Sequence, residues 1–315
     1  MKVYLISLLS FFLLSCATKQ NKTPTLKSWN LDTHKSAPES AFYHAASGRI
    51  FISNIVGSPV TKDGQGWISI ADTEGHMIKE KWVEGLNAPK GIRIFEETLW
   101  VSDIDRVLGY QIKSGQQVAN IEIPGAKFLN DVAIDGEGRI YVSDTFTNKI
   151  HVIEKNKVST FAQGKNLESP NGLLVVGNKL YVASWGNITD FATFGTTVPG
   201  RLYYLDLKSK KQTFVTPKPL GNLDGLELDA QGNFIVSDWA QGIIYRIGDS
   251  GVSEVLFANF DGPADLALIQ EKNLIIVPRM NEGIVSALKM PKTNQAQIDE
   301  AIITDQEEKD FSEQE

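Results

Sequence analysis

The stretch NDVAIDGEGRIYVSD at residues 130–144 carries the pattern that decides the fold, and DGLELDAQGNFIVSD at residues 224–238 repeats it. Each copy contains a short apolar segment, a turn with glycine, and an alternating segment that ends in serine and aspartate. Alternating apolar and polar residues on both sides of such a turn predict a β-hairpin. The repetition indicates a fold built from copies of one β-unit.

Four shorter matches bring the number of copies to six. They are IFISN, LWVSD, LYVAS and LIIVP, and the six copies end at residues 54, 103, 144, 184, 238 and 278. Each copy is followed by another β-rich stretch, and no long segment after the N-terminal leader has helical periodicity. Four short strands in each repeat of about forty residues predict an all-β, six-bladed β-propeller.

The propeller is expected to cover residues 33–290. Two stacked β-sandwiches are the alternative fold, although they would not explain one repeat that runs through the whole chain. Propellers often close when one end of the chain adds a strand to a blade made by the other end. Either residues 29–31 or residues 301–304 could supply that strand, and the sequence does not choose between them.

The first 15 residues predict a cleaved lipoprotein signal peptide. Lys2 precedes an apolar run from Val3 to Leu14, which is too short to span a bilayer but fits a signal peptide. The run ends in LLSC, similar to a bacterial lipobox, and Cys16 is the only cysteine in the chain. We therefore expect lipidation at Cys16, a polar tether over residues 16–32, and a protein anchored by lipid to the bacterial cell envelope, on a periplasmic or other extracytoplasmic face. An ordinary signal peptide with an incidental cysteine is the alternative.

Composition and charge exclude several classes of protein. A single cysteine excludes an intramolecular disulfide framework and a cysteine-based zinc site. The net charge of −7 equals that of residues 299–315, which hold eight acidic residues and one lysine within the predicted acidic tail at residues 291–315. The body is therefore neutral, and we expect no nucleic-acid partner. The tail is expected to be a solvated end, with an acidic docking segment as the alternative.

A ring of polar residues is predicted at the mouth of the central channel, because the first strand of each propeller blade lines that channel. Alignment of the six copies gives one residue per blade, and these are Glu39, Lys90, Asn130, Asn171, Asp224 and Ala264. Two carboxylates and two carboxamides around one axis offer hard oxygen ligands, which favour Ca²⁺, Mg²⁺ or Mn²⁺ over zinc or copper. The alternative is that these residues solvate a water-filled channel.

Two insertions follow the second strand of their copies, at residues 55–66 and 185–200. Because successive strands alternate in direction, both insertions are expected on the face that carries the polar ring. The second insertion starts at Trp185 and contains Phe191 and Phe194, so it is a candidate cover for a bound substrate. A passive long loop is the alternative.

The residues around the ring resemble the motifs of the senescence marker protein (regucalcin)/gluconolactonase/luciferin-regenerating-enzyme family of six-bladed propellers, over about residues 38–288. The matching segments are PESAF at 38–42, LNDVA at 129–133, PNGL at 170–173 and DGL at 224–226. The resemblance implies that Glu39, Asn171 and Asp224 bind a divalent cation and that Asn130 lies beside it. We expect calcium first, with magnesium, manganese or zinc as alternatives. The family's basic substrate-binding residue, two places before the Asn-Asp motif, is Phe128 in this chain.

Two functions from different classes fit these features. The first is a divalent-metal-dependent hydrolase that opens a small-molecule lactone or a related ester. Its expected residues are Asp224 as general base, Glu39, Asn171 and Asp224 as metal ligands, and Asn130, Lys90 and Trp185 as substrate contacts. No Gly-x-Ser-x-Gly motif occurs, so a covalent serine mechanism is not expected. The second is a non-catalytic, lipid-anchored propeller that binds a ligand or a protein partner.

Overall fold

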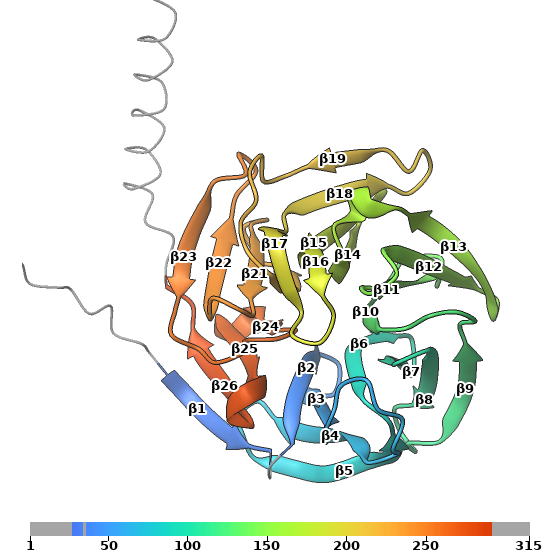
Figure 1. Cartoon of the computed structure of the whole chain (residues 1–315). Helices are drawn as coiled ribbons and strands as arrows, with labels where there is room; N and C mark the ends of the chain where they lie inside the picture. The colour runs from blue at the N-terminus through green and yellow to red at the C-terminus, as the bar shows by residue number, and fades with distance from the viewer. Residues whose placement is uncertain (1–26, 34–35, 292–315) are drawn as a thin grey trace, which may run out of the picture.

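The computed structural model describes residues 27–33 and 36–291. Six four-stranded antiparallel sheets surround a central axis, so the predicted six-bladed β-propeller is confirmed (Figure 1). The helical segments within these residues are three short 3₁₀ helices, η1 (Lys165–Leu167), η2 (Gln270–Lys272) and η3 (Met280–Glu282). None of the helices in this part of the chain has the length and apolar character needed to cross a membrane. The predicted signal peptide, Cys16 and the acidic tail lie outside the described residues.

The first three blades each consist of four consecutive strands, which follow one another from the axis outward. Blade 1 contains β2 (Ala37–His44), β3 (Arg49–Ile55), β4 (Gly66–Asp72) and β5 (Met77–Leu86). Blade 2 contains β6 (Pro89–Phe95), β7 (Thr98–Asp103), β8 (Arg106–Gln111) and β9 (Gln117–Glu122). Blade 3 contains β10 (Leu129–Ile134), β11 (Ile140–Asp144), β12 (Lys149–Glu154) and β13 (Lys157–Gln163).

The last three blades include one inserted hairpin and one strand from the other end of the chain. Blade 4 contains β14 (Pro170–Val176), β15 (Lys179–Ser184), β18 (Leu202–Asp206) and β19 (Gln212–Phe214), and the inserted hairpin consists of β16 (Gly186–Asp190) and β17 (Gly195–Pro199). Blade 5 contains β20 (Leu223–Leu228), β21 (Phe234–Asp238), β22 (Ile243–Ile247) and β23 (Ser253–Phe257). Blade 6 contains β24 (Ala267–Ile269), β25 (Leu274–Arg279), β26 (Ile284–Lys289) and β1 (Lys27–Asp32).

The N-terminal strand closes the propeller. β1 pairs antiparallel with β26, so the first strand in the sequence is the outermost strand of the last blade (Figure 1). The indole N–H of Trp29 donates to the carbonyl of Thr73 in blade 1 at 2.9 Å, which ties the closing strand to its neighbour. Residues 27–32, which the sequence assigned to the tether, therefore belong to the fold. Of the two candidate closing strands the structure uses residues 29–31, while residues 301–304 lie outside the described residues.

Neighbouring blades pack through the apolar residues that alternate along their strands. Ile50 and Ile52 of blade 1 are fully buried in one cluster with Ile269 and Ile276 of blade 6. Burial of apolar surface is the main favourable contribution to folding. Because each sheet is held between two others, the inner strands form a firm wall around the axis.

The aspartate at the end of a blade's second strand accepts hydrogen bonds from the backbone segment that leads into the first strand of the same blade. The carboxylate of Asp103 accepts the backbone N–H of Ala88 at 2.8 Å, and that of Asp144 accepts the N–H of Phe128 at 2.9 Å. Buried N–H groups need such partners, so the repeated aspartate has a structural reason. It places the first residues of each inner strand, where the predicted ring lies.

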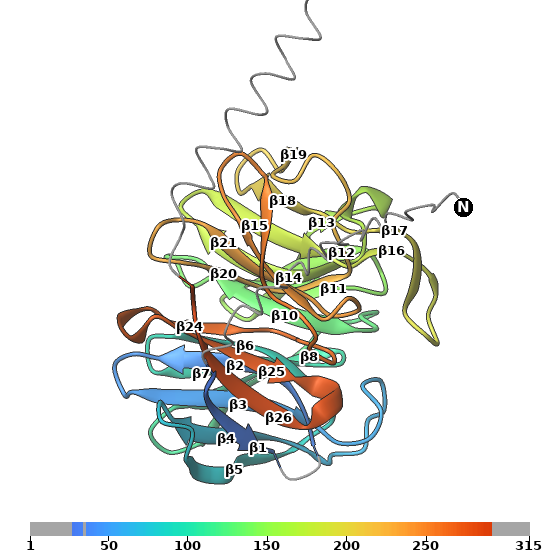
Figure 2. The ribbon, with the colours of Figure 1, turned by 90° about the vertical axis from the view of Figure 1, so that its left-hand side faces the viewer.

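Both insertions rise from the same face of the disc, as the strand directions predict (Figure 2). One is the loop at residues 56–65 between β3 and β4, and the other is the hairpin β16–β17. Figure 1 shows the hairpin in front of the central region of the propeller. A ligand site is therefore expected on the face that carries the insertions.

Candidate ligand site at the channel mouth

The inner strands are irregular where they reach the channel mouth. The pairing register between the first and second strands shifts between Pro38 and Ser40 in blade 1 and between Leu223 and Leu226 in blade 5, and blades 2, 3 and 4 show the same irregularity. Such an irregularity frees a residue from the ladder and redirects its side chain. The predicted ring residues lie at these points in five blades, and Ala264 precedes β24 in the sixth. None of the six is more than 6% exposed.

The serine before each strand-ending aspartate or asparagine supports the ring from behind. In blade 3, Ser143 Oγ accepts the N–H of Asp131 at 2.9 Å, and in blade 5 Ser237 Oγ accepts the N–H of Gly225 at 2.7 Å. Ser53 does the same for the N–H of Ser40 at 2.9 Å. Each contacted residue directly follows a ring position. The repeated serine thus holds the irregular part of the inner strand, which a regular ladder would not do.

Glu39 and Asp224 share one electrostatic environment, although 185 positions separate them in the numbering. Burial raises the pKa of both carboxyl groups well above its ordinary value. After burial, the charge of Asp224 is the largest influence that raises the pKa of Glu39. Asn171 makes a hydrogen bond to Asp224 that opposes the rise in the pKa of that residue, and its amide also donates to the carbonyl of Leu223 at 3.3 Å. The fold therefore gathers Glu39, Asn171 and Asp224 at one place.

Two oxygens of this group are buried and have no hydrogen-bond donor within the described protein. They are Glu39 Oε2 and Asn171 Oδ1. Buried polar atoms are satisfied in the great majority of cases, so two such oxygens without a donor, beside the carboxylate of Asp224, need an explanation. An oxygen-preferring divalent cation would satisfy them, and its charge would relieve the repulsion between Glu39 and Asp224. The donor set fits such an ion, even though the residues described contain no group of three or more His, Cys, Asp or Glu side chains arranged to hold a metal.

The other two polar ring residues lie in different surroundings. The side-chain N–H of Asn130 donates to Thr145 Oγ1 over a long distance of 3.5 Å. Lys90 Nζ donates to the carbonyls of Pro59 and Ala88 at 3.1 and 3.0 Å. Burial lowers the pKa of Lys90 to about 8. Its hydrogen bond to Pro59 links the loop at residues 56–65 to the ring, so Lys90 holds this loop in place. The contact of Lys90 with a substrate stays a prediction.

A second layer of charge lies next to the ring, and the sequence reasoning missed it. Arg93 from β6 lies 3.4 Å from Asp265 Oδ2, 3.4 Å from Glu227 Oε1 and 3.6 Å from Asp131 Oδ2. Ser40 Oγ also donates to Asp265 Oδ2, at 2.5 Å. We call Arg93, Asp131, Glu227 and Asp265 the arginine layer; it joins four blades across the axis. Asp131 and Asp265 each directly follow a ring position, and that placement was the signal available in the sequence.

Aromatic side chains stand beside the ring on the face of the insertions. They form a continuous series of ring contacts with centroid distances of 4.4 to 6.1 Å, and we call them the aromatic rim: Phe128, Phe146, Trp185, Phe191, Phe194 and Trp239. Trp185 is only 7% exposed and its indole N–H donates to the carbonyl of Phe194 at 2.9 Å, so it anchors the hairpin β16–β17 from inside. Phe191 is 54% exposed, so its ring is accessible from the solvent. The sequence indicated the hairpin residues but not that Phe128, Phe146 and Trp239 join them.

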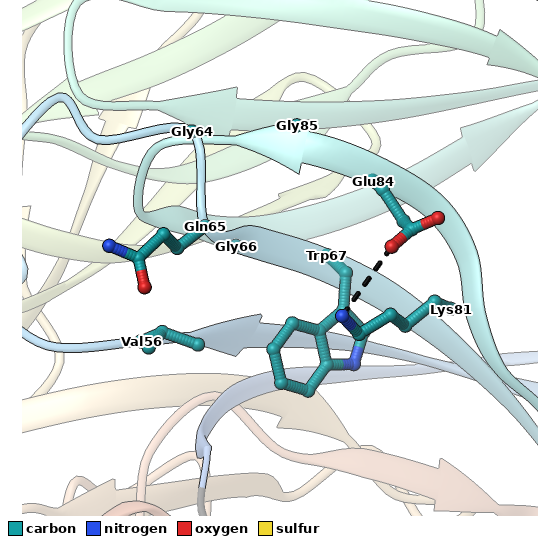
Figure 3. A pocket seen from close by; sticks show the side chains of 8 residues that line it. All are labelled: Val56, Gly64, Gln65, Gly66, Trp67, Lys81, Glu84 and Gly85. Atoms are coloured by element: carbon teal, nitrogen blue, oxygen red, sulfur yellow. Dashed lines mark ion pairs between the residues drawn. The ribbon is translucent and has the colours of Figure 1, made fainter.

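A surface groove of about 360 Å³ lies on blade 1, away from the ring (Figure 3). It runs along Trp67, whose ring lies 4.8 Å below Lys81 Nζ, and Lys81 also pairs with Glu84 at 3.4 Å. None of the ring residues lines this groove. The groove therefore has no part in the chemistry considered for the channel mouth.

The buried carboxyl groups predict how the stability of the metal-free protein depends on pH. Burial raises the pKa of Glu227 to about 7 and of Asp131 to about 8, so the folded protein binds protons that the unfolded chain has released. The stability from these groups is complete below the unfolded pKa near 4 and is lost as the pH rises through the folded values. We expect the free energy of unfolding to fall by more than about 1 kcal/mol between about pH 5.5 and 7.5.

Urea unfolding in EDTA at the two pH values measures this change. The window stops below about pH 8 because Lys90, with its lowered pKa, acts in the opposite direction above that value. Glu227→Gln is the control, since it removes one titrating group and should reduce the slope. A free energy of unfolding that stays level or rises over the window would contradict the expectation.

The fold and the ring define the chain as a six-bladed β-propeller with a polar site at one channel mouth. Comparison of the sequence with protein families and with curated proteins found no match. Among solved structures, the chain is similar to a gluconolactonase from Xanthomonas campestris, with 13% identity and a TM-score of 0.62 over 85% of this chain and 89% of the other.

Two other solved structures show the same likeness. A calcium-binding regucalcin from Agrobacterium tumefaciens matches with 15% identity and a TM-score of 0.60, over 84% of this chain and 92% of the other. A catalytically inactive virginiamycin B lyase from Staphylococcus aureus, solved with quinupristin, matches with 13% identity and a TM-score of 0.57, over 84% and 99%. The TM-scores of 0.57 to 0.62 establish a shared fold, which a gluconolactonase and a lyase have in common, and at 13–15% identity they establish the fold alone.

Proposed function

We propose that the protein is a divalent-metal-dependent hydrolase that opens a lactone or a related ester at the channel mouth. The observation that carries the proposal is the pair of buried oxygens without a donor, Glu39 Oε2 and Asn171 Oδ1, beside the carboxylate of Asp224. Glu39, Asn171 and Asp224 would hold the cation, and calcium suits their oxygen donors best. The likeness to a gluconolactonase and to a calcium-binding regucalcin supports the choice of reaction and ion.

The bound cation would polarise the substrate carbonyl and stabilise the negative charge that develops on its oxygen. Asp224 is the general base: its burial raises the pKa of the carboxyl group, which makes the carboxylate a better proton acceptor than an exposed aspartate. The amide of Asn130 would orient the substrate. Because the ring is almost fully buried, bulk water is kept from the reacting groups.

The hydrolysis balances with water as the co-reactant. The water oxygen forms a bond to the carbonyl carbon while its proton moves to Asp224. The C–O bond of the lactone or ester then breaks, and the leaving oxygen takes the proton back from Asp224. The products are a carboxylic acid and an alcohol, joined in one hydroxy acid when the substrate is a lactone.

A non-catalytic, ligand-binding propeller is the second candidate, and the closed mouth favours it. The ring residues are at most 6% exposed, and Lys90 is fully engaged with backbone carbonyls rather than turned to a ligand. For either function we propose a lipid anchor at Cys16 on the bacterial cell envelope. The propeller starts at Lys27, so a short segment would separate it from the lipid.

Calcium is expected to stabilise the wild-type protein. Calcium at about 100 times its dissociation constant adds about 2.7 kcal/mol to the free energy of unfolding if it binds the folded state alone. Glu39→Gln should abolish this gain, because it removes a charged ligand from the buried group. Glu84→Gln is the matched control, since Glu84 is exposed on blade 1 and should leave the gain unchanged.

The hydrolase is tested by lactone opening with and without EDTA. We expect activity in calcium, loss in EDTA, and a fall of at least about 100-fold in Asp224→Asn with the fold intact. A protein that gains stability from calcium but opens no lactone or ester would support the non-catalytic candidate. Absence of any calcium effect on stability would overturn the metal site itself.

A further inference from the structure

The aromatic rim continues directly from the polar ring. Phe128 lies two residues before Asn130 in the sequence, and its ring centroid is 4.4 Å from Lys90 Nζ. Phe146 stacks on Phe128 with centroids 4.4 Å apart and an angle of 16° between the ring planes. Phe194 then contacts both rings, at 5.4 and 5.2 Å. A ligand that reaches the ring from the face of the insertions therefore passes along aromatic surface.

Hydrogen bonds to blade 5 hold the hairpin β16–β17 in place beside this aromatic surface. The amide of Asn222 donates to the carbonyl of Trp185 at 2.7 Å and to Thr196 Oγ1 at 3.0 Å, which joins the hairpin to the start of blade 5. Phe191, near its tip, packs edge-on against Phe146 at 5.1 Å yet remains 54% exposed. An exposed phenyl ring on a hairpin beside a buried polar site is suited to cover an apolar group.

The charges at the mouth disfavour an anionic substituent on the ligand. The ring and the arginine layer contain the carboxyl groups of Glu39, Asp131, Asp224, Glu227 and Asp265. Their two basic partners are already engaged, Lys90 with backbone carbonyls and Arg93 with three of the carboxylates. Glu39 and Asp224 would neutralise the charge of a divalent cation bound in the ring. No unpaired positive charge would then remain to bind an acidic group of the ligand.

We propose that the aromatic rim recognises the apolar substituent of a neutral lactone or ester, so that the preferred substrates carry an alkyl or aryl chain rather than the hydroxyl groups of a sugar acid. This inference rests on the proposed hydrolase for the reactive group. It adds the part of the substrate that lies outside the ring: a flat or flexible apolar chain that lies against the rings of Phe146, Phe191 and Phe194. Aromatic side chains bury much apolar surface and lose little conformational freedom.

Three lactones and one lactam test the substrate class. δ-Decalactone carries an alkyl chain, δ-valerolactone has the same reactive ring without the chain, and D-glucono-δ-lactone carries hydroxyl groups. We expect the kcat/KM of wild-type protein in calcium to be highest for δ-decalactone. The lactam with the same alkyl chain has a much less reactive carbonyl than the lactone, so we expect its binding, measured by calorimetry, to report recognition without hydrolysis.

Phe191→Ala and Val198→Ala form a matched pair of variants. Both residues are exposed on the hairpin β16–β17, but Val198 is not part of the aromatic rim. Phe191→Ala should lower kcat/KM for δ-decalactone and weaken lactam binding, each by about 10-fold, and should leave δ-valerolactone within about twofold of wild type. Val198→Ala should change none of these values.

The outcomes separate this inference from the proposed function. If D-glucono-δ-lactone is the best substrate and Phe191→Ala changes neither δ-decalactone opening nor lactam binding, the inference is overturned and the hydrolase stands. If the lactam binds and Phe191→Ala weakens it, but no lactone opens, the inference on ligand class stands and the hydrolase is overturned. If the lactam does not bind and no lactone opens, both are overturned.

Discussion

Arg93→Met is expected to lower the free energy of unfolding by about 3–5 kcal/mol, because it leaves buried carboxylates without their cation. The guanidinium group lies within 3.4 to 3.6 Å of Asp131, Glu227 and Asp265 and is nearly fully buried. It also donates to the carbonyls of Ile92 and Leu173, at 2.8 and 3.4 Å. Methionine fills a similar volume but offers neither charge nor donors, so these groups would stay buried and unpaired.

The loss should depend on pH in a direction that a simple packing defect would not show. Without Arg93, the pKa values of the three carboxyl groups rise further, and protonation can replace the lost cation. The deficit of Arg93→Met should therefore be smaller at about pH 5.5 than at about pH 7.5. Arg49→Met, at an exposed position on β3, is the control and should change the free energy of unfolding by less than about 0.5 kcal/mol.

Urea unfolding of the two variants and the wild type, in EDTA at both pH values, makes this measurement. A deficit of equal size at both pH values would mean that Arg93 acts through packing alone. A deficit no larger than that of Arg49→Met would mean that the arginine layer contributes nothing to stability.

The polar ring could be found from the sequence because it follows the repeat. Each ring residue stands nine to eleven residues before the core of the second strand of its copy, and that strand's pattern recurs in every blade. Serines and aspartates that hold the inner strand recur with it in several blades. A sequence pattern that recurs in every repeat predicts the positions that recur with it. The same reasoning placed Glu39, Asn171 and Asp224 together, and the structure brings them to one mouth.

The arginine layer and the hydrogen bonds of Lys90 could not be predicted from the repeat. Arg93 occurs at its position in one blade only, and its meaning depends on carboxylates from three other blades. The orientation of Lys90 depends on the carbonyl of Pro59, which lies in the insertion at residues 55–66 and not in the repeated part of the chain. Features that arise once, from contacts between distant blades, leave no repeated trace in the sequence.

The closing strand could be predicted from the sequence only in part. Residues 29–31 were one of two candidates, and pairing with β26 over Lys27–Asp32 decides between them. A single short strand gives little signal by itself, since its stability comes from pairing with a distant segment. The tether boundary was placed at residue 32 for the same reason.

Gly172→Ala is expected to lower the free energy of unfolding by about 3 kcal/mol or more, at the upper end of what an overpacked core costs. A Cβ atom at Gly172 would lie 1.9 Å from the carbonyl oxygen of Asp224 and 3.3 Å from the Cβ of Ala183. The first contact is with the backbone of the next blade, which cannot rotate away as a side chain can. Blades 4 and 5 would have to separate at the point where Asn171 meets Asp224.

This variant therefore tests the site as well as the fold. Because Asn171 precedes Gly172, separation of the two inner strands should also reduce the stabilisation by calcium, even where the protein remains folded by circular dichroism. Gly136→Ala is the matched control: no atom lies within 4 Å of its added Cβ, and its backbone does not have a positive φ. It should leave both the free energy of unfolding and the calcium effect within about 0.5 kcal/mol of wild type. If Gly172→Ala matches that control in both measurements, the inner strands of blades 4 and 5 do not approach as closely as the proposed metal site requires.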